Sequence, residues 1–298
     1  MSSNTVPPDF GRRLRRWRLG LATLFGRRPK GFFIPCSYAD EVPDTILPYA
    51  GYEALFRSSE PVFQAVLDVI DGYRDALLAI GETERDSAPP QPRWMQGWFA
   101  RLDAAAAYSM VRARQPARIV EVGSGHSTRF MVRAAIDGDL AMEFTAIDPA
   151  PRAAIDQLGV THLEQTVQEA GTEPYRDLAE GDILFIDSSH IAMPGTDVDF
   201  LMNQVLPCLP PGVLVHIHDI CLPDPYPPEW GWRGYNEQQV VAPLLAGGGF
   251  RPVFASHYVA TRMAAALAAG VVGKLPLRPG TPETSLWLEK TSPPLAYL

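Results

Sequence analysis

Carboxylate and imidazole side chains follow two apolar segments of this chain, at the point where each segment ends. Asp187 and His190 follow the first segment, and His218 and Asp219 follow the second. Such groups move protons or bind metal ions near neutral pH. If both segments are parallel strands, their carboxyl ends lie at one edge of a sheet, where α/β proteins bind ligands. The pattern predicts a catalytic or metal-binding site at that edge.

Two further histidines lie close to these segments. His257 lies near the end of a later expected strand, so we expect it at the same edge, although a lone histidine is commonly a polar core residue. His216 alternates with His218 on one face of its strand, one step deeper. We interpret His216 as a structural residue or as a support for the site.

A glycine-containing segment, residues 119–128, reads Ile-Val-Glu-Val-Gly-Ser-Gly-His-Ser-Thr. Gly123 and Gly125 allow a sharp turn and a close approach to a ligand, and Ser127 and Thr128 can cap a following helix. Thr128 stands where a full dinucleotide fingerprint has its third glycine. The segment alone indicates either a nucleotide-type binding loop or an ordinary strand-to-helix turn.

Asp148 ends the next expected strand, within Ala-Ile-Asp-Pro at 146–149. A carboxylate at this position can accept hydrogen bonds from both hydroxyls of a ribose, and it can also serve as a helix N-cap. Together with the glycine segment, Asp148 favours a nucleoside-binding site.

Apolar segments alternate with helical patterns from residue 117 onward, which predicts an α/β fold. We expect strands at 117–123, 142–148, 160–166, 181–187, 212–219, 251–258 and 283–290, and helices at 94–114, 126–136, 150–157, 196–208, 236–247 and within 261–280. This order predicts a Rossmann-like, seven-stranded, mainly parallel sheet with helices on both faces. We place a basic arm and helical extension at residues 1–92, with helical periodicity at 50–83, and the main domain at residues 93–298.

Composition narrows the classes of function. The 298 residues carry a formal net charge of -8, which argues against general nucleic-acid binding. The cysteines, Cys36, Cys208 and Cys221, form no CxxC pair and suit a reducing cytosol, so we expect a cytoplasmic protein. No apolar run approaches the roughly 20 residues of a membrane-spanning helix.

The N-terminal arm concentrates positive charge. Residues 12–30 contain no acid and eight cations: Arg12, Arg13, Arg15, Arg16, Arg18, Arg27, Arg28 and Lys30. Apolar residues recur at helical spacing between them, at Leu14, Trp17, Leu21, Leu24 and Phe25. Residues 12–30 therefore predict either peripheral contact with an anionic membrane, or packing of the stripe on the main domain or on a second subunit of a homo-oligomer.

Five motifs carry a resemblance to a known family: EVGSGHST, AIDPAPR, DILFIDSSH, LPPGVLVHIHDI and WRGYNEQ. With them, residues 93–290 resemble the class I S-adenosylmethionine-dependent methyltransferases of the methyltransferase domain 24 group, which is related to the catechol and macrocin O-methyltransferases. The resemblance implies that S-adenosylmethionine is the cofactor. It implies a cofactor site at Glu121, Gly123, Ser124, Gly125, His126, Ser127, Thr128, Asp148 and Asp187.

The resemblance also implies a metal site. In catechol-type enzymes, carboxylates and an amide after the fourth and fifth strands bind a divalent cation, and these positions fall on Asp187, His218 and Asp219. A histidine ligand favours Mn²⁺, Fe²⁺ or Zn²⁺ over Mg²⁺. The family's lysine base falls on His190, whose neutral imidazole can take a proton near pH 7. We therefore expect His190, His218 and Asp219 to be catalytic.

The sequence thus predicts methyl transfer from S-adenosylmethionine to an oxygen, or a nitrogen, of a small-molecule or glycosidic acceptor. The Pro- and aromatic-rich segment 222–238 is expected either to shape the acceptor pocket or to form a rigid loop. Two alternatives stay open: a metal-dependent hydrolase that uses the Asp/His cluster, and a non-catalytic binding module with a methyltransferase-like fold. The acceptor itself is not predicted, because acceptor recognition lies in variable loops.

Overall fold

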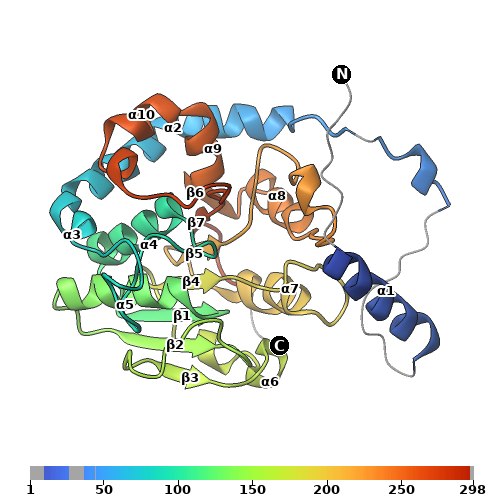
Figure 1. The fold of residues 1–298 in the computed structure, drawn as a ribbon, viewed down its shortest axis with the longest axis horizontal. Helices are drawn as coiled ribbons and strands as arrows, with labels where there is room; N and C mark the ends of the chain where they lie inside the picture. Colours follow the sequence, from blue (N-terminus) through green and yellow to red (C-terminus); the bar gives the residue numbers. More distant parts are fainter. Residues whose placement is uncertain (1–9, 27–36, 44, 296–298) are drawn as a thin grey trace.

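A seven-stranded sheet forms the centre of the protein, in a computed structural model that describes residues 10–26, 37–43 and 45–295. The strand order is β3-β2-β1-β4-β5-β7-β6 (Figure 1). The strands are β1 Arg118–Val122, β2 Glu143–Ile147, β3 Thr161–Leu163, β4 Ile183–Ile186, β5 Leu214–Ile217, β6 Phe250–Ala255 and β7 Leu286–Lys290. Neighbouring strands run parallel except at β7, which is antiparallel to both β5 and β6. The predicted Rossmann-like fold is confirmed.

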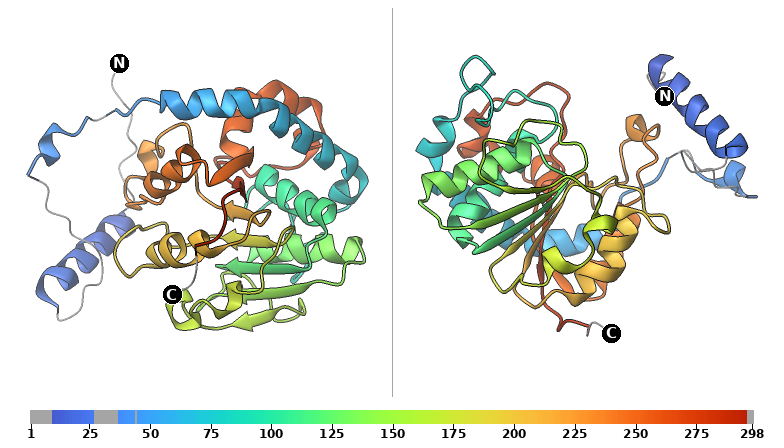
Figure 2. Two further views of the ribbon diagram at one scale, coloured as in Figure 1. Left: turned by 180° about the vertical axis from the view of Figure 1, so that it is seen from behind. Right: turned by 90° about the horizontal axis from the view of Figure 1, so that it is seen from below.

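The central strands β4 and β5 are buried along their whole length. Their sequences, Ile-Leu-Phe-Ile and Leu-Val-His-Ile, are almost continuously apolar because helices cover both faces of the sheet. Figure 2 shows α4 and α5 on one face, and α7 and α8 on the other. The switch in strand order between β1 and β4 places the carboxyl ends of these strands beside the expected ligand-binding edge.

The longer helices largely follow the predicted periodicity. The helices are α1 Phe10–Phe25, α2 Ala50–Gly72, α3 Arg74–Leu78, α4 Arg101–Arg114, α5 His126–Asp137, α6 Val167–Ala170, α7 Asp197–Phe200, α8 Gln238–Ala246, α9 Ser256–Arg262 and α10 Ala264–Ala269. Short helical turns lie at Ala39–Glu41, Glu173–Tyr175, Leu201–Val205, Leu206–Cys208, Pro228–Trp230 and Val272–Lys274. Among the described residues, no helix has the length and apolar character needed to cross a membrane.

Three predicted elements were wrong in detail. Residues 150–157 form turns and bends instead of a helix. The helix predicted at 94–114 begins only at Arg101, after bends. The strand predicted at 251–258 ends at Ala255, and α9 begins with the next residue.

The predicted N-terminal extension is in contact with the sheet. Phe56 and Phe63 of α2 pack edge-on against Tyr258 of α9, with ring centroids 5.6 and 5.9 Å apart, and Phe63 also meets Phe254 of β6 at 6.1 Å. Glu60 accepts a hydrogen bond from the Tyr258 hydroxyl at 2.7 Å. This aromatic cluster joins α2 to the last part of the α/β core. The boundary between residues 92 and 93 stays a prediction.

Replacing Phe63 with alanine should destabilise the whole protein. The ring is fully buried, so its loss should cost about 3–5 kcal/mol of unfolding free energy, measured by urea denaturation. Val62→Ala is the matched control, because Val62 is half exposed on the same helix. Separate unfolding of α2, seen as a first transition that alone responds to Phe63→Ala, would contradict the single cooperative unit inferred from the cluster.

Candidate active site

Two adjoining cavities lie at the carboxyl ends of the central strands. The first, the glycine-loop cavity, has a volume of about 390 Å³ and is lined by residues of the β1, β2 and β4 ends, including Gly123, Ser124 and Asp148. The second, the aromatic cavity, has a volume of about 560 Å³ and is lined by Trp98, Trp230, Trp232, Tyr235, His218 and Asp219 among others. Arg152, Asp187 and Ser189 line both cavities. A ligand in one cavity would therefore lie next to a ligand in the other.

The glycine loop passes very close to the end of β4. Gly123 has φ of 76°, and a Cβ atom there would collide with the carbonyl oxygen of Asp187. Only glycine meets both demands without strain. Asp148 fixes Ser124, the residue after Gly123, because its Oδ2 accepts a hydrogen bond from the Ser124 amide at 2.6 Å. Its Oδ1 accepts one from the Ala150 amide at 2.8 Å.

Glu121 lies behind the loop, not on the cavity wall. Its two carboxylate oxygens accept hydrogen bonds from the hydroxyls of Ser127 and Thr128, each at 2.5 Å. Thr128 Oγ1 also accepts from the Gly125 amide at 2.9 Å. Complete burial raises the pKa of Glu121 to about 8, against the opposing effect of these hydroxyls. Glu121 thus ties the end of β1 to the first turn of α5.

The predicted cofactor residues therefore divide into two groups. Those that line the glycine-loop cavity are Gly123, Ser124, Asp148 and Asp187. Those outside its lining are Glu121, Gly125, His126, Ser127 and Thr128, which shape the loop from behind. His126 is neutral near pH 7, because burial and the nearby Arg129 and Arg93 lower its pKa to about 4.

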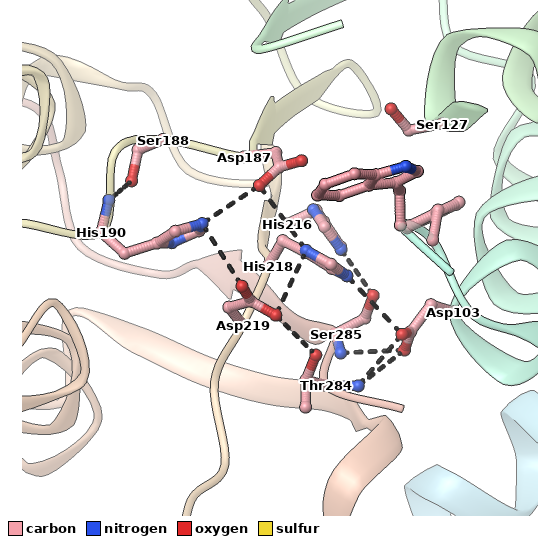
Figure 3. A network of polar contacts seen from close by, with 12 residues as sticks. Asp103, Ser127, Asp187, Ser188, His190, His216, His218, Asp219, Thr284 and Ser285 are labelled. Carbon is pink, nitrogen blue, oxygen red and sulfur yellow. Dashed lines mark hydrogen bonds and ion pairs between the residues drawn. The ribbon is translucent and has the colours of Figure 1, made fainter. Parts of the chain in front are cut away.

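The predicted catalytic residues come together around His190 (Figure 3). Its Nε2 lies 3.2 Å from Asp187 Oδ1 and 3.5 Å from Asp219 Oδ2. On its other side, Nδ1 lies 2.9 Å from Glu237 Oε2. His218 Nδ1 lies 3.6 Å from a carboxylate oxygen of both Asp187 and Asp219. Two imidazoles and three carboxylates thus form one network between β4, β5 and α8.

The backbone at this network is unusual. His190 and Asp219 both have positive φ, 61° and 55°, a conformation that non-glycine residues adopt rarely. His190 is held there by its carbonyl oxygen, which accepts hydrogen bonds from the amides of Asn236 and Glu237 at 3.0 and 3.2 Å. Strained positions of this kind concentrate at functional sites.

Charge pairing decides the protonation of the network. Burial lowers the pKa of His190, but hydrogen bonds to Asp187 and Glu237 outweigh burial and hold that pKa well above the usual histidine value. Burial likewise lowers the pKa of His218, but the charges of Asp219 and Asp187 outweigh burial and hold that pKa well above the usual histidine value. The neutral resting imidazole expected from the sequence is therefore not the form that these surroundings favour.

Two carboxylates of the network region were missed or undervalued in the sequence. Asp103 of α4 is fully buried, accepts hydrogen bonds from the Thr284 and Ser285 amides, and lies 3.6 Å from His218 Nε2. Along the sequence, Asp103 lies in an Ala-rich segment far from the residues that follow the strands, and no local motif marks it. Glu237 lies in segment 222–238, and its carboxylate pairs with His190.

The donor atoms do not form a metal site in this arrangement. Among residues 10–26, 37–43 and 45–295, no group of three or more His, Cys, Asp or Glu side chains is arranged to hold a metal ion. The His190 ring nitrogen lies near both Asp187 and Asp219, and the Arg233 guanidinium lies 3.4 Å from Asp219 Oδ2. Cationic side chains therefore neutralise the carboxylates that were expected to bind the metal.

His257 does not join the network. It lies on α9, where its Nε2 meets Asp224 Oδ2 at 2.7 Å, and Arg262 binds the same carboxylate. β6 ends at the same edge as β5, since Ala255 and Ile217 both pair with Leu286, but α9 begins at once and His257 pairs with Asp224 outside the network. His216 has the supporting position expected of it, fully buried and stacked on Phe185 at 3.7 Å.

The aromatic cavity carries positive charge on its walls. Arg152 stacks on Trp98 at 4.7 Å, and Arg233 stacks on Trp230 at 4.3 Å. Arg15 and Arg16 of α1 also line this cavity. Most of the aromatic wall, Trp230, Trp232 and Tyr235, comes from segment 222–238.

Comparison with known families agrees with this geometry. Residues 120–220, which span the glycine loop, Asp148 and the network residues from Asp187 to Asp219, match the family model Methyltransf_24, a methyltransferase domain. Residues 120–220 are thus similar to the methyltransferases of this group. No curated protein sequence matches the chain.

Solved structures of methyltransferases are also similar. The methyltransferase PaMTH1 of Podospora anserina, solved with S-adenosylhomocysteine (SAH), is 16% identical with a TM-score of 0.41, over 84% of this chain and 100% of that one. A putative O-methyltransferase from Klebsiella pneumoniae is 14% identical with a TM-score of 0.40, over 81% and 100%. The O-methyltransferase TomG from Streptomyces achromogenes is 16% identical with a TM-score of 0.38, over 83% and 100%.

Glu121 should make the stability of the protein depend on pH. The folded protein keeps the Glu121 proton up to about pH 8, whereas the unfolded chain releases it near its ordinary value of 4.5. The free energy of unfolding should therefore fall as pH rises from about 4.5 to 8, by on the order of 4 kcal/mol from this group.

Glu121→Gln should remove this contribution. In urea unfolding, the free energy of unfolding of the variant should therefore rise relative to that of the wild type between pH 5 and pH 8. Glu164→Gln, at an exposed position, is the control, and its free energy of unfolding should change with pH as that of the wild type does. An equal slope in wild type and Glu121→Gln would refute the buried, protonated carboxyl.

Proposed function

We propose that the protein transfers the methyl group of S-adenosylmethionine to a hydroxyl oxygen of a small-molecule or glycosidic acceptor. The observation that carries the proposal is the junction of the two cavities at Asp187, with the glycine loop on one side and the Asp/His network on the other. Methyl transfer needs such a junction, because donor and acceptor must be aligned in line and one proton must be removed.

The glycine-loop cavity fits the cofactor. The close approach of Gly123 to Asp187 leaves backbone where a side chain would fill the space, and Asp148 presents a carboxylate on the cavity wall. Asp148 would accept the ribose hydroxyls, while Gly123 and Ser124 would lie against the cofactor. When bound, S-adenosylmethionine supplies an electrophilic methyl group on a sulfonium sulfur.

The aromatic cavity suits the acceptor. Its indole and phenol rings would stack on a planar ring or on the apolar face of a sugar. Asp187 and Asp219 are the network carboxylates on its wall, and His190 is buried just behind them. We propose that either carboxylate relays the acceptor proton to Nε2 of neutral His190, and that Glu237 stabilises the imidazolium at Nδ1.

This role uses the less abundant form of His190, since the surrounding carboxylates favour the imidazolium. The same carboxylates make His190 a stronger base once it is neutral. The hydrolase alternative needs the cluster as a metal site and leaves the glycine loop without a role. Methyl transfer uses the loop and the cluster together, which is why we prefer it.

Asp148→Ala should weaken binding of SAH. Loss of charge-assisted hydrogen bonds to the ribose should cost on the order of 1.5–3 kcal/mol in titration calorimetry. Asp156→Ala, an exposed neighbour in the same loop region, is the control and should bind normally. A folded Asp148→Ala protein with wild-type affinity would remove the ribose assignment.

His190→Gln should reduce turnover far more than cofactor affinity. General-base catalysis contributes about 10²–10⁴-fold, so a loss in this range is expected in transfer of a labelled methyl group to a panel of phenolic and glycosidic hydroxyls. Glu237→Gln, which keeps the shape but not the charge beside Nδ1, should cost less. Undiminished turnover in a folded His190→Gln protein would show that the proton leaves by another route.

A further inference from the structure

The helix α1 displays an exposed apolar stripe. Its large apolar residues are among the most exposed of the described chain, with Phe10 at 78%, Trp17 at 69% and Phe25 at 84% exposure. Leu14, Leu21 and Leu24 are also exposed. At 3.6 residues per turn, all six fall within about 100° of arc on one side of the helix. Exposure of such an apolar stripe to water is unfavourable, and a stripe of this kind marks an interaction surface.

The charges of α1 are arranged around this stripe. The helix contains five arginines and no acid, although the whole chain carries -8. By helical geometry, Arg13 and Arg18 flank the stripe, one on each side. Arg15, Arg16 and Leu19 lie on the opposite side and line the aromatic cavity. One side of α1 therefore faces the enzyme, and the arginine-flanked apolar side faces outward.

The outward surface continues to the mouth of the aromatic cavity. Arg16 and Trp232 line both that cavity and a second hollow of about 450 Å³, which is also lined by Arg13, Trp17, Gly20, Leu21 and Leu24 of α1. Figures 1 and 2 show α1 at the periphery, on the side of α7 and α8. A surface that bound the stripe would lie beside the opening of the proposed acceptor site.

We propose that α1 docks the protein on the surface of an anionic lipid membrane. An apolar stripe flanked by arginines matches both layers of such a surface, since the stripe enters the acyl boundary while the guanidiniums stay among the headgroup phosphates. A second copy of α1 fits less well. Face-to-face packing of two stripes would bring Arg13 and Arg18 toward the same cations of the partner, with no acid in the helix to pair with them.

Docking in this orientation places the aromatic cavity next to the bilayer. If the proposed methyl transfer holds, the acceptor hydroxyl then belongs to a molecule that lies in or at the membrane. The docking itself needs no methyl transfer, so the test below addresses it separately. Arg27, Arg28 and Lys30, which were part of the predicted basic arm, and Cys36 lie outside the described residues.

The test is sedimentation of the full chain with vesicles of phosphatidylcholine alone or with one-third phosphatidylglycerol, at low and high salt. We expect binding to the anionic vesicles at low salt, and weaker binding to neutral vesicles or in high salt. Arg13→Gln/Arg18→Gln should lower the partition coefficient at least about tenfold, because each cation near an anionic surface contributes roughly fivefold. Arg57→Gln/Arg176→Gln removes the same charge from exposed sites outside α1 and should bind like the wild type.

The apolar stripe is tested in the same way. Leu14→Ser/Leu24→Ser should bind anionic vesicles weakly, whereas Leu78→Ser/Ile136→Ser, at exposed positions outside α1, should bind normally. Equal sedimentation of all these proteins, or none by the wild type, would overturn the proposal. So would a concentration-dependent dimer, seen by analytical ultracentrifugation, that Leu14→Ser/Leu24→Ser converts to monomer. SAH affinity, measured in parallel, should be unchanged in every variant, which separates failure of docking from failure of the proposed function.

Discussion

The active-site region depends on the pairing of buried charges around His190. Three carboxylates, of Asp187, Asp219 and Glu237, lie within 3.5 Å of its two ring nitrogens. Unpaired, the buried carboxylates of Asp219 and Glu237 would carry a large desolvation cost. Because Asp187 follows β4, Asp219 follows β5 and Glu237 precedes α8, the imidazole connects three separate elements. The positive φ of His190 is maintained by the Asn236 and Glu237 amides, which bind its carbonyl oxygen.

The second constraint is the contact of Gly123 with the carbonyl of Asp187. It brings the loop after β1 against the end of β4, so that Asp187 faces both cavities. Glu121 supports this loop from behind through two hydroxyls, and Asp148 holds it from the side through the Ser124 amide. The glycine-loop cavity therefore has a preformed shape, as expected of a site that aligns a bound donor for in-line transfer.

Much of this arrangement could be predicted from the sequence. The alternation of apolar segments and helices predicts the sheet, and the residues after β1, β2, β4 and β5 meet because parallel strands share one edge. Long-range contacts could not be predicted in this way. Asp103 reaches His218 from α4, and Glu237 reaches His190 from beyond the aromatic segment, so no local spacing identifies either pair. Periodicity also placed a helix at 150–157, where the chain forms turns and bends, and it could not show that His257 pairs with Asp224 outside the network.

The role expected of Glu121 shows how a correct motif can mislead about a single residue. Its position after an apolar strand and before two glycines matches the family pattern. In the structure, however, the buried carboxyl of Glu121 binds the hydroxyls of Ser127 and Thr128. Glu121 would therefore affect a ligand through the loop. Similarly, the expected metal ligands do lie together, yet His190 and Arg233 supply the positive charge that the carboxylates need.

In the proposed reaction, donor and acceptor meet at Asp187. A crystal structure of the protein with SAH would show whether they do. We expect the ribose at Asp148, the adenosyl group in the glycine-loop cavity, and the sulfur directed past Asp187 toward the aromatic cavity. SAH bound elsewhere, or bound with its sulfur turned away from Asp187, would rule out this meeting point.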